Sequence, residues 1–339
     1  MAPIGWGIAG TGRIARTVLP DFIHVPDAHV AAVASRTREH AESFADLAFS
    51  TLPDHPRPRA YASYAEMLED PDVDVVYVAT PHPQHKPIAL AALAAGKAIL
   101  VEKSFAATHA GASEIVEAAR AKGLFAMEGI WSRFLPVIRE MDLAVAAGEI
   151  GEVTSVQGDL FALRDFDPED RLFNPELGGG ATLDLGVYAI NFAVGRLGSP
   201  TRVTAAGSLF PNGVDADVAM LLEHRGERTA TLAVSLRADG PGRMAIHGTH
   251  GWIEVEPRFH HPSRIVVHRR GVIPQVHEAP QSGRGYSHEL IEVGQCLRDG
   301  RTESTIMPLD DTLEVSRVMQ SVLEQVGVTH HDDEELPHG

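Results

Sequence analysis

The first third of the chain alternates short apolar runs with segments of helical character. Apolar runs occupy residues 4–9, 28–35, 73–79 and 98–101, with a shorter one at 124–127. Helical patterns separate them, over 38–48, 84–95 and 110–122 among others. Near-continuous apolar strands between helices are typical of a parallel sheet covered on both faces. The pattern therefore predicts a doubly wound α/β domain of the nucleotide-binding type.

The pattern changes after about residue 150, where strands follow each other closely. Strands are predicted at 153–163, 202–209, 214–224, 228–237, 243–248, 252–256 and 264–269, and helices at 181–195, 287–298 and 309–326. Turn residues between most strands favour an antiparallel sheet. We predict a nucleotide-binding domain over 1–125, an α+β domain over 126–330, and a polar, unpacked tail over 331–339.

Composition narrows the class of protein. A chain of 339 residues suits two domains, and 44% hydrophobic with 22% charged residues is ordinary for a globular protein. The sequence contains no apolar run of about 18 residues, so we expect no membrane span. The N-terminus leads directly into a strand pattern and the single cysteine, Cys296, has no internal partner, so we expect a cytoplasmic protein. A net charge of −17 argues against a nucleic-acid partner.

A glycine-rich turn follows the first predicted strand. Residues 10–15, GTGRIA, form a G-x-G-x-x-A element between a strand and a helix. Gly10 permits the tight turn, Gly12 lets a pyrophosphate approach the backbone, and Ala15 keeps helix and strand close. We assign these residues to dinucleotide binding: Gly10, Thr11, Gly12, Arg13 and Ile14.

The end of the second predicted strand bears on the choice between NAD and NADP. An acidic residue there would hold the ribose 2′-hydroxyl of NAD, but the strand ends in Ser35, Arg36 and Thr37. Arg36 can pair with a 2′-phosphate, and its two neighbours can donate hydrogen bonds. The sequence therefore favours NADP over NAD, unless Arg36 is only a solvated helix-start residue.

Polar residues follow two more strands at the edge where an open α/β sheet binds its ligands. Glu102 and Lys103 follow the strand at 98–101, and the segment 80–85, TPHPQH, follows the strand at 73–79. A lysine in that position can lie beside a nicotinamide, although an isolated Glu-Lys pair is more often a surface feature. We assign these residues to the cofactor site: Thr80, Pro81, His82, His85, Glu102 and Lys103.

A second group of polar residues lies on one predicted helix of the C-terminal half. Three glycines at 178–180 precede Asp184 and Tyr188, which are four residues apart and so project from one face. The glycines permit close approach of a ligand to the backbone. The two residues could also form a structural hydrogen-bonded pair. The presence of Lys103 favours a catalytic role over that alternative.

Taken together, the motifs GIAGTGRIA, VYVATPHPQH, ILVEKSF, MEGIWSRFLP and GGGATLDLGVY resemble the Gfo/Idh/MocA oxidoreductase family, in the same order. The resemblance covers nearly the whole chain and is clearest over 4–195, and it points toward the dihydrodiol and D-xylose dehydrogenase branch. It implies a Rossmann domain joined to an α+β domain, whose large open sheet forms a homodimer interface. It also implies that Lys103, Asp184 and Tyr188 are catalytic. The proline of the family's E-K-P motif is Ser104 here, which puts the aim of Lys103 in doubt.

These residues predict hydride transfer between nicotinamide and a carbon that bears a hydroxyl group, without a metal. Free tyrosine has a pKa of about 10, which a nearby ammonium would lower, so we favour Tyr188 as acid/base over Lys103 itself. Lys103 would neutralise charge on the substrate oxygen. We expect four further residues to contact a sugar or diol substrate: Trp131, Arg133, Phe134 and Arg164. Asp165 and Arg171, in the loop 164–177, are weaker candidates.

Two other classes of function remain open. A non-catalytic NADP(H) sensor would keep the fold but would be expected to lack Lys103 or the Asp184–Tyr188 pair, all of which are present. A structural or assembly protein that uses the open sheet would need neither group. Binding of NADPH without turnover across a broad substrate panel would favour the sensor.

Overall fold

The computed structural model describes residues 3–337, and the contacts divide the chain into two compact units. Unit 1 comprises Met1–Trp131, Ser282–Thr312 and His331–Gly339, and unit 2 comprises Ser132–Gln281 and Leu313–His330; residues 1–2 and 338–339 lie outside the described part. The sequence placed one boundary near 125 and the tail outside both domains. The contacts instead return the segment 282–312 and the described part of the tail to unit 1.

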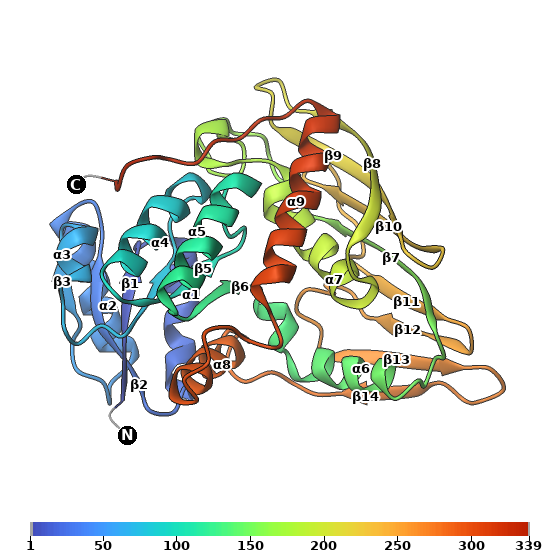
Figure 1. Ribbon diagram of the computed structural model, residues 1–339, viewed down its shortest axis with the longest axis horizontal. Helices are drawn as coiled ribbons and strands as arrows, with labels where there is room; N and C mark the ends of the chain where they lie inside the picture. The colour runs from blue at the N-terminus through green and yellow to red at the C-terminus, as the bar shows by residue number, and fades with distance from the viewer. Residues whose placement is uncertain (1–2, 338–339) are drawn as a thin grey trace. The chain divides into compact units, whose positions relative to one another are not determined.

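The sheet of unit 1 is the predicted doubly wound parallel sheet (Figure 1). Its six strands run in the order β3-β2-β1-β4-β5-β6, which is the order of a dinucleotide-binding fold. The strands are β1 (Ile4–Ala9), β2 (Ala28–Ala34), β3 (Arg59–Tyr61), β4 (Val75–Val78), β5 (Ala98–Glu102) and β6 (Ala126–Gly129). The helices are α1 (Arg13–Val18), α2 (Arg38–Thr51), α3 (Tyr64–Leu68), α4 (His85–Ala94), α5 (His109–Lys122) and α8 (Ser287–Arg298), with 3-10 turns at Leu19–His24, His82–Gln84 and Trp131–Phe134.

Helices cover both faces of this sheet, which explains why its strands are apolar throughout. Every residue of β4 and β5 is buried, and α4 packs against both strands. Gly123 ends α5 with a φ of 63°, a left-handed conformation that glycine adopts readily. Ser63 begins α3 without a side-chain capping hydrogen bond. The proline-rich segment 50–60 contributes the first residues of the edge strand β3.

Unit 2 contains the predicted large, mostly antiparallel sheet. Its eight strands run in the order β14-β13-β12-β11-β7-β10-β9-β8, and only the β7–β10 pair is parallel. The strands are β7 (Val153–Phe161), β8 (Pro200–Leu209), β9 (Asp215–His224), β10 (Arg228–Ser235), β11 (Met244–Gly248), β12 (Gly251–Val255), β13 (Arg264–Arg269) and β14 (Gln275–Glu278). The helices are α6 (Pro136–Ala146), α7 (Val187–Leu197) and α9 (Leu309–Val326), with a 3-10 turn at Pro175–Leu177 and a π-helical turn at Thr182–Gly186.

The two faces of this sheet differ in character. Alternate residues of β9 and β10 are buried on the face that α7 covers, since α7 packs against β7 and β10. The other face carries large apolar side chains in solvent: Leu221 is 40% exposed and Trp252 is 44% exposed. The sequence pattern missed α6 and β14. The segment Pro175–Leu197 is long and apolar enough to cross a membrane, but 89% of its most apolar window is buried within the protein, as in a core helix.

Candidate active site

The glycine-rich turn has the backbone geometry that its sequence predicted. Gly10 has a φ of 106°, and a Cβ there would lie 2.8 Å from the carbonyl oxygen of Ala79, so only glycine fits. A Cβ on Gly12 would meet no described atom within 4 Å, so the backbone on that side is open. Thr11 donates from its hydroxyl to Ser35 across the turn, at 3.3 Å. The turn can therefore accept a group that approaches Gly12 closely.

The residues after β2 divide into one buried and two exposed side chains. Ser35 is buried beneath the turn, whereas Arg36 and Thr37 are exposed. Thr37 caps α2 by accepting a hydrogen bond from the backbone of His40 at 3.3 Å. Arg36 makes no hydrogen bond or ion pair with any described residue, so its guanidinium remains available to a ligand. Arg13 is also exposed, and Ile14 is half-buried.

The segment after β4 contains a polar atom that the protein itself leaves unsatisfied. The hydroxyl of Thr80 is buried and has no hydrogen-bond partner among the described residues. Buried hydroxyls nearly always have partners, so an orphaned one at this edge of a dinucleotide-binding sheet fits a ligand that supplies the bond. Pro81 is half-buried and His82 is buried, and the ring of His82 lies edge-on to that of His85 at 5.7 Å.

Lys103 follows β5, where the sequence placed it, and is half-buried. Its backbone N–H donates to the Glu102 carboxylate at 3.2 Å, and its peptide bond to Ser104 is cis. The His85 ring lies between two loops, with Nδ1 at 2.9 Å from the carbonyl oxygen of Ser104 and Nε2 at 2.8 Å from that of Thr80. His85 thus ties the loop after β4 to the loop that carries Lys103.

Several acidic and phenolic groups are buried behind this loop. Tyr77 donates to Glu102 at 2.5 Å, and burial, together with the charge of that carboxylate, raises the pKa of Tyr77 well above its usual value. Glu289, from α8, is fully buried, and neither of its oxygens has a hydrogen-bond partner among the described residues. Burial, reinforced by the charges of Glu102 and Asp21, raises the pKa of Glu289 well above its usual range. This environment favours the protonated form of Glu289.

In unit 2, Asp184 lies in the π-helical turn that precedes α7. Such turns are uncommon and occur frequently at functional sites. Arg171, from the preceding loop, donates to the Asp184 carboxylate at 3.1 Å, so one of the loop's candidate residues contacts a predicted catalytic residue. Gly180 has a φ of 126°, and a Cβ there would lie 2.1 Å from Asp215, which accepts from the backbone of Thr182. The glycine thus allows Asp215 to anchor the start of the turn.

Tyr188 is the second residue of α7 and is 8% exposed. Its ring lies 5.1 Å from that of His260, and it lines a small pocket together with Arg133 and Asn191. Arg133 is buried and donates from Nε to Asn191 at 2.6 Å. Nη2 of Arg133 also donates to the backbone carbonyl oxygen of Asn191 at 3.4 Å, and the role of Arg133 in substrate binding stays a prediction.

The remaining predicted substrate residues have different environments. Trp131 is buried, and its ring stacks on that of Tyr286 at 4.5 Å, while Phe134 is also buried. Arg164 is exposed and donates to the carbonyl oxygen of Leu163 at 2.8 Å. Sequence reasoning missed Tyr286 beside Trp131 and His260 beside Tyr188. Both come from distant segments without a motif, so no local pattern could have indicated them.

Comparison with known proteins decides the family. Residues 4–130 match the Gfo/Idh/MocA oxidoreductase family with an NAD-binding Rossmann fold, and residues 138–254 match the C-terminal domain of that family. The chain belongs to the Gfo/Idh/MocA family. This member is 37% identical to trans-1,2-dihydrobenzene-1,2-diol dehydrogenase of Xenopus laevis, over 96% of this chain and 98% of that protein.

Two further similarities support the assignment. The Gfo/Idh/MocA chain is 34% identical to the D-xylose 1-dehydrogenase (NADP(+)) of Hypocrea jecorina, over 96% of this chain and 92% of that one. The crystal structure of the aldose-aldose oxidoreductase of Caulobacter crescentus, complexed with glycerol, matches with a TM-score of 0.85 and 28% identity, over 96% of this chain and 98% of that chain. The protein is therefore an NAD(P)-dependent dehydrogenase of this family, and the predicted family and both predicted folds are confirmed.

Proposed function

We propose that this enzyme is a cytoplasmic, NADP-dependent dehydrogenase that oxidises a carbon bearing a hydroxyl group in a sugar or a cyclic diol. One observation carries the proposal: Lys103 lies just past β5 of the dinucleotide-binding sheet, in a chain that also holds an acid and a phenol four residues apart. Relatives named for a dihydrodiol and for D-xylose support the class of substrate.

The proposed chemistry divides between three side chains. Bound NADP would supply a nicotinamide that accepts hydride from the substrate carbon. In its phenolate form, Tyr188 would act as the general base and take the hydroxyl proton as that carbon is oxidised. Lys103 would donate a hydrogen bond to the same oxygen and stabilise its developing negative charge. Asp184, held by Arg171, would orient the substrate.

The preference for NADP rests on Arg36. Its guanidinium is exposed and makes no hydrogen bond or ion pair with other described residues, and the strand before it ends without an acidic residue. A free guanidinium beside the ribose position suits a 2′-phosphate, with which it can form two parallel hydrogen bonds. The name of the Hypocrea relative, which includes NADP, agrees with this preference.

The test of the proposed function is a substrate panel run with both cofactors. Aldoses and cyclic diols are mixed with NADP or NAD, and the absorbance of reduced nicotinamide is followed. We expect turnover with at least one member of either class, with a higher kcat/KM for NADP. Binding of NADPH, seen as a change in its fluorescence, without turnover of any substrate would instead favour the sensor.

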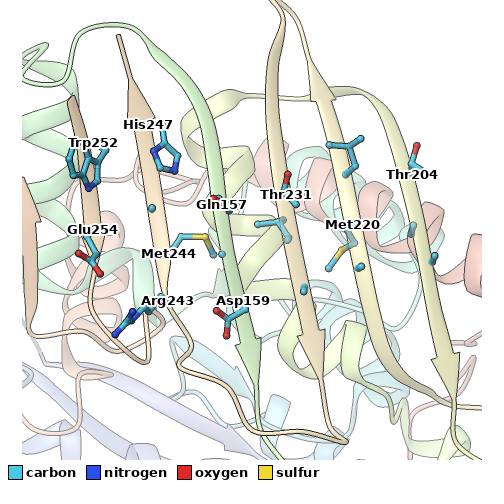
Figure 2. A pocket seen from close by; sticks show the side chains of 18 residues that line it. Gln157, Asp159, Thr204, Met220, Thr231, Arg243, Met244, His247, Trp252 and Glu254 are labelled. Carbon is cyan, nitrogen blue, oxygen red and sulfur yellow. The ribbon is translucent and has the colours of Figure 1, made fainter. Parts of the chain in front are cut away.

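We further propose that a second copy of this chain covers the outer face of the unit 2 sheet. That face has a hollow of about 820 Å³ over β7 to β12, which Figure 2 shows from close by. Small residues such as Ala206 and Ala219 line it alongside the exposed Leu221 and Trp252. A largely apolar face of this kind suits an isologous interface. Sedimentation of wild type and Leu221→Arg should give a dimer and a monomer, respectively.

A further inference from the structure

The C-terminal segment 331–337 packs against unit 1 instead of forming the unpacked tail that its sequence predicted. Asp332 accepts a hydrogen bond from the backbone N–H of Ala107 at 2.8 Å and another from the hydroxyl of Thr108. The backbone N–H of Asp333 donates to the carbonyl oxygen of Pro83 at 2.8 Å. The segment is thereby fixed to the residues that precede α4 and α5.

A buried cation adds a second anchor for this segment. Lys86, at the start of α4, has a side chain that is only 6% exposed, and it donates to Glu334 at 2.8 Å. Its other acidic neighbour, Glu114, is 3.7 Å away. A buried ammonium needs a close carboxylate, so departure of the segment would leave Lys86 poorly paired.

The residues that Asp332 holds belong to the loop that carries Lys103. Within this loop, the backbone N–H of Phe105 donates to Glu128 at 3.1 Å, and the carbonyl of Ser104 faces His85. Ala107 is the next anchored residue, and its anchor is Asp332. The contacts therefore fix the loop successively at 104, 105, 107 and 108, and the last two depend on a residue more than 200 positions away.

We propose that Asp332 is a positioning residue, which fixes the loop after β5 and so aims Lys103 at the substrate oxygen. The inference rests on the proposed catalytic role of Lys103. Burial raises the pKa of Asp332 more than its hydrogen bonds to Thr108 and Ala107 lower it. The two hydrogen bonds that Asp332 accepts from Ala107 and Thr108 carry the proposal.

Gly111 offers a way to displace Asp332 without altering it. Gly111 lies in the first turn of α5, and a Cβ there would lie 2.2 Å from Oδ2 of Asp332. Gly111→Ala should therefore expel the carboxylate. The same change should leave the helix as stable or more so, because glycine in a helix is about 1 kcal/mol less favourable than alanine.

The experiment compares Asp332→Ala, Gly111→Ala and the double variant, each as the full chain. We expect each single variant to lower kcat by about 10-fold or more, since small misplacements of catalytic groups are costly. The double variant should lose no more than Asp332→Ala alone, because no carboxylate is left to displace. Hydrogen exchange at the amides of residues 105–111 should become faster in all three.

The matched control is Asp333→Ala, which removes the same charge from the neighbouring residue, whose side chain makes no hydrogen bond with described residues. Asp333→Ala should retain the wild-type kcat and the wild-type rates of hydrogen exchange at residues 105–111. Wild-type kcat in both Asp332→Ala and Gly111→Ala, or an equal loss in the control, would overturn the proposal. Lys103→Met distinguishes a failure of the proposed function from a failure of the proposed role of Asp332. Full activity in that variant would refute the proposed function, whatever the hydrogen exchange at 105–111 shows.

Discussion

The two groups of predicted catalytic residues are held in place in different ways. In unit 2, Asp184 and Tyr188 owe their spacing to one continuous helical segment, which Asp215 anchors at its start. In unit 1, the loop of Lys103 depends on His85, Glu128 and Asp332, which come from three separate parts of the chain. The comparison teaches that a helix can supply geometry locally, whereas a loop between strand and helix must take its geometry from distant contacts.

The strongest test of the helical half is Tyr188→Phe. The change removes one hydroxyl and keeps the ring beside His260, so packing should be preserved. General acid–base catalysis contributes about 100-fold to 10,000-fold, and we expect kcat to fall by that factor. Steady-state kinetics on the best substrate of the panel measures it, and NADPH fluorescence should show unchanged cofactor affinity. A fall in kcat of less than about threefold would indicate that Lys103, and not Tyr188, is the acid/base.

The corresponding test of the loop half is Lys103→Met, which keeps the length of the side chain and removes its charge. Loss of one group that stabilises charge in the transition state costs about 100-fold to 1,000-fold in kcat. Lys122→Met, in the exposed last turn of α5, is the matched control and should behave as wild type. An equal loss in both variants would mean that general effects of charge, not the position of Lys103, explain the result.

The same contrast explains how much the sequence could predict. Local patterns were enough for both folds and for the glycine turn, because each depends on neighbours within a few residues. They could not reveal that Tyr286 stacks on Trp131, that Glu128 binds the backbone of Phe105, or that the acidic tail is packed. Those contacts join residues far apart in the chain and carry no periodic signal.

A smaller effect is expected from Arg36→Glu, which tests the cofactor end of unit 1. A charge-assisted hydrogen bond contributes about 1.5–3 kcal/mol, so removing it should weaken NADP binding by about 10-fold to 100-fold. The new carboxylate should also repel the 2′-phosphate and leave NAD binding nearly unaffected. Titration of the wild type and of Arg36→Glu with both cofactors measures the affinities. An equal loss of affinity for NADP and NAD would mean that Arg36 does not cause the preference for NADP.

The last and smallest effect is on stability, not on activity, and concerns Glu289, the buried acid behind the lysine loop. Because its pKa in the folded protein lies well above the unfolded value of about 4.3, the folded state binds the extra proton. The stability due to this proton is complete below pH of about 4.3 and is lost as pH rises toward the folded pKa. Glu289→Gln cannot ionise, so its stability relative to wild type should grow as pH rises above about 4.3. Denaturant unfolding between pH 5 and about 8 measures the difference, and a constant gap across that range would mean that Glu289 is ionised in the folded protein.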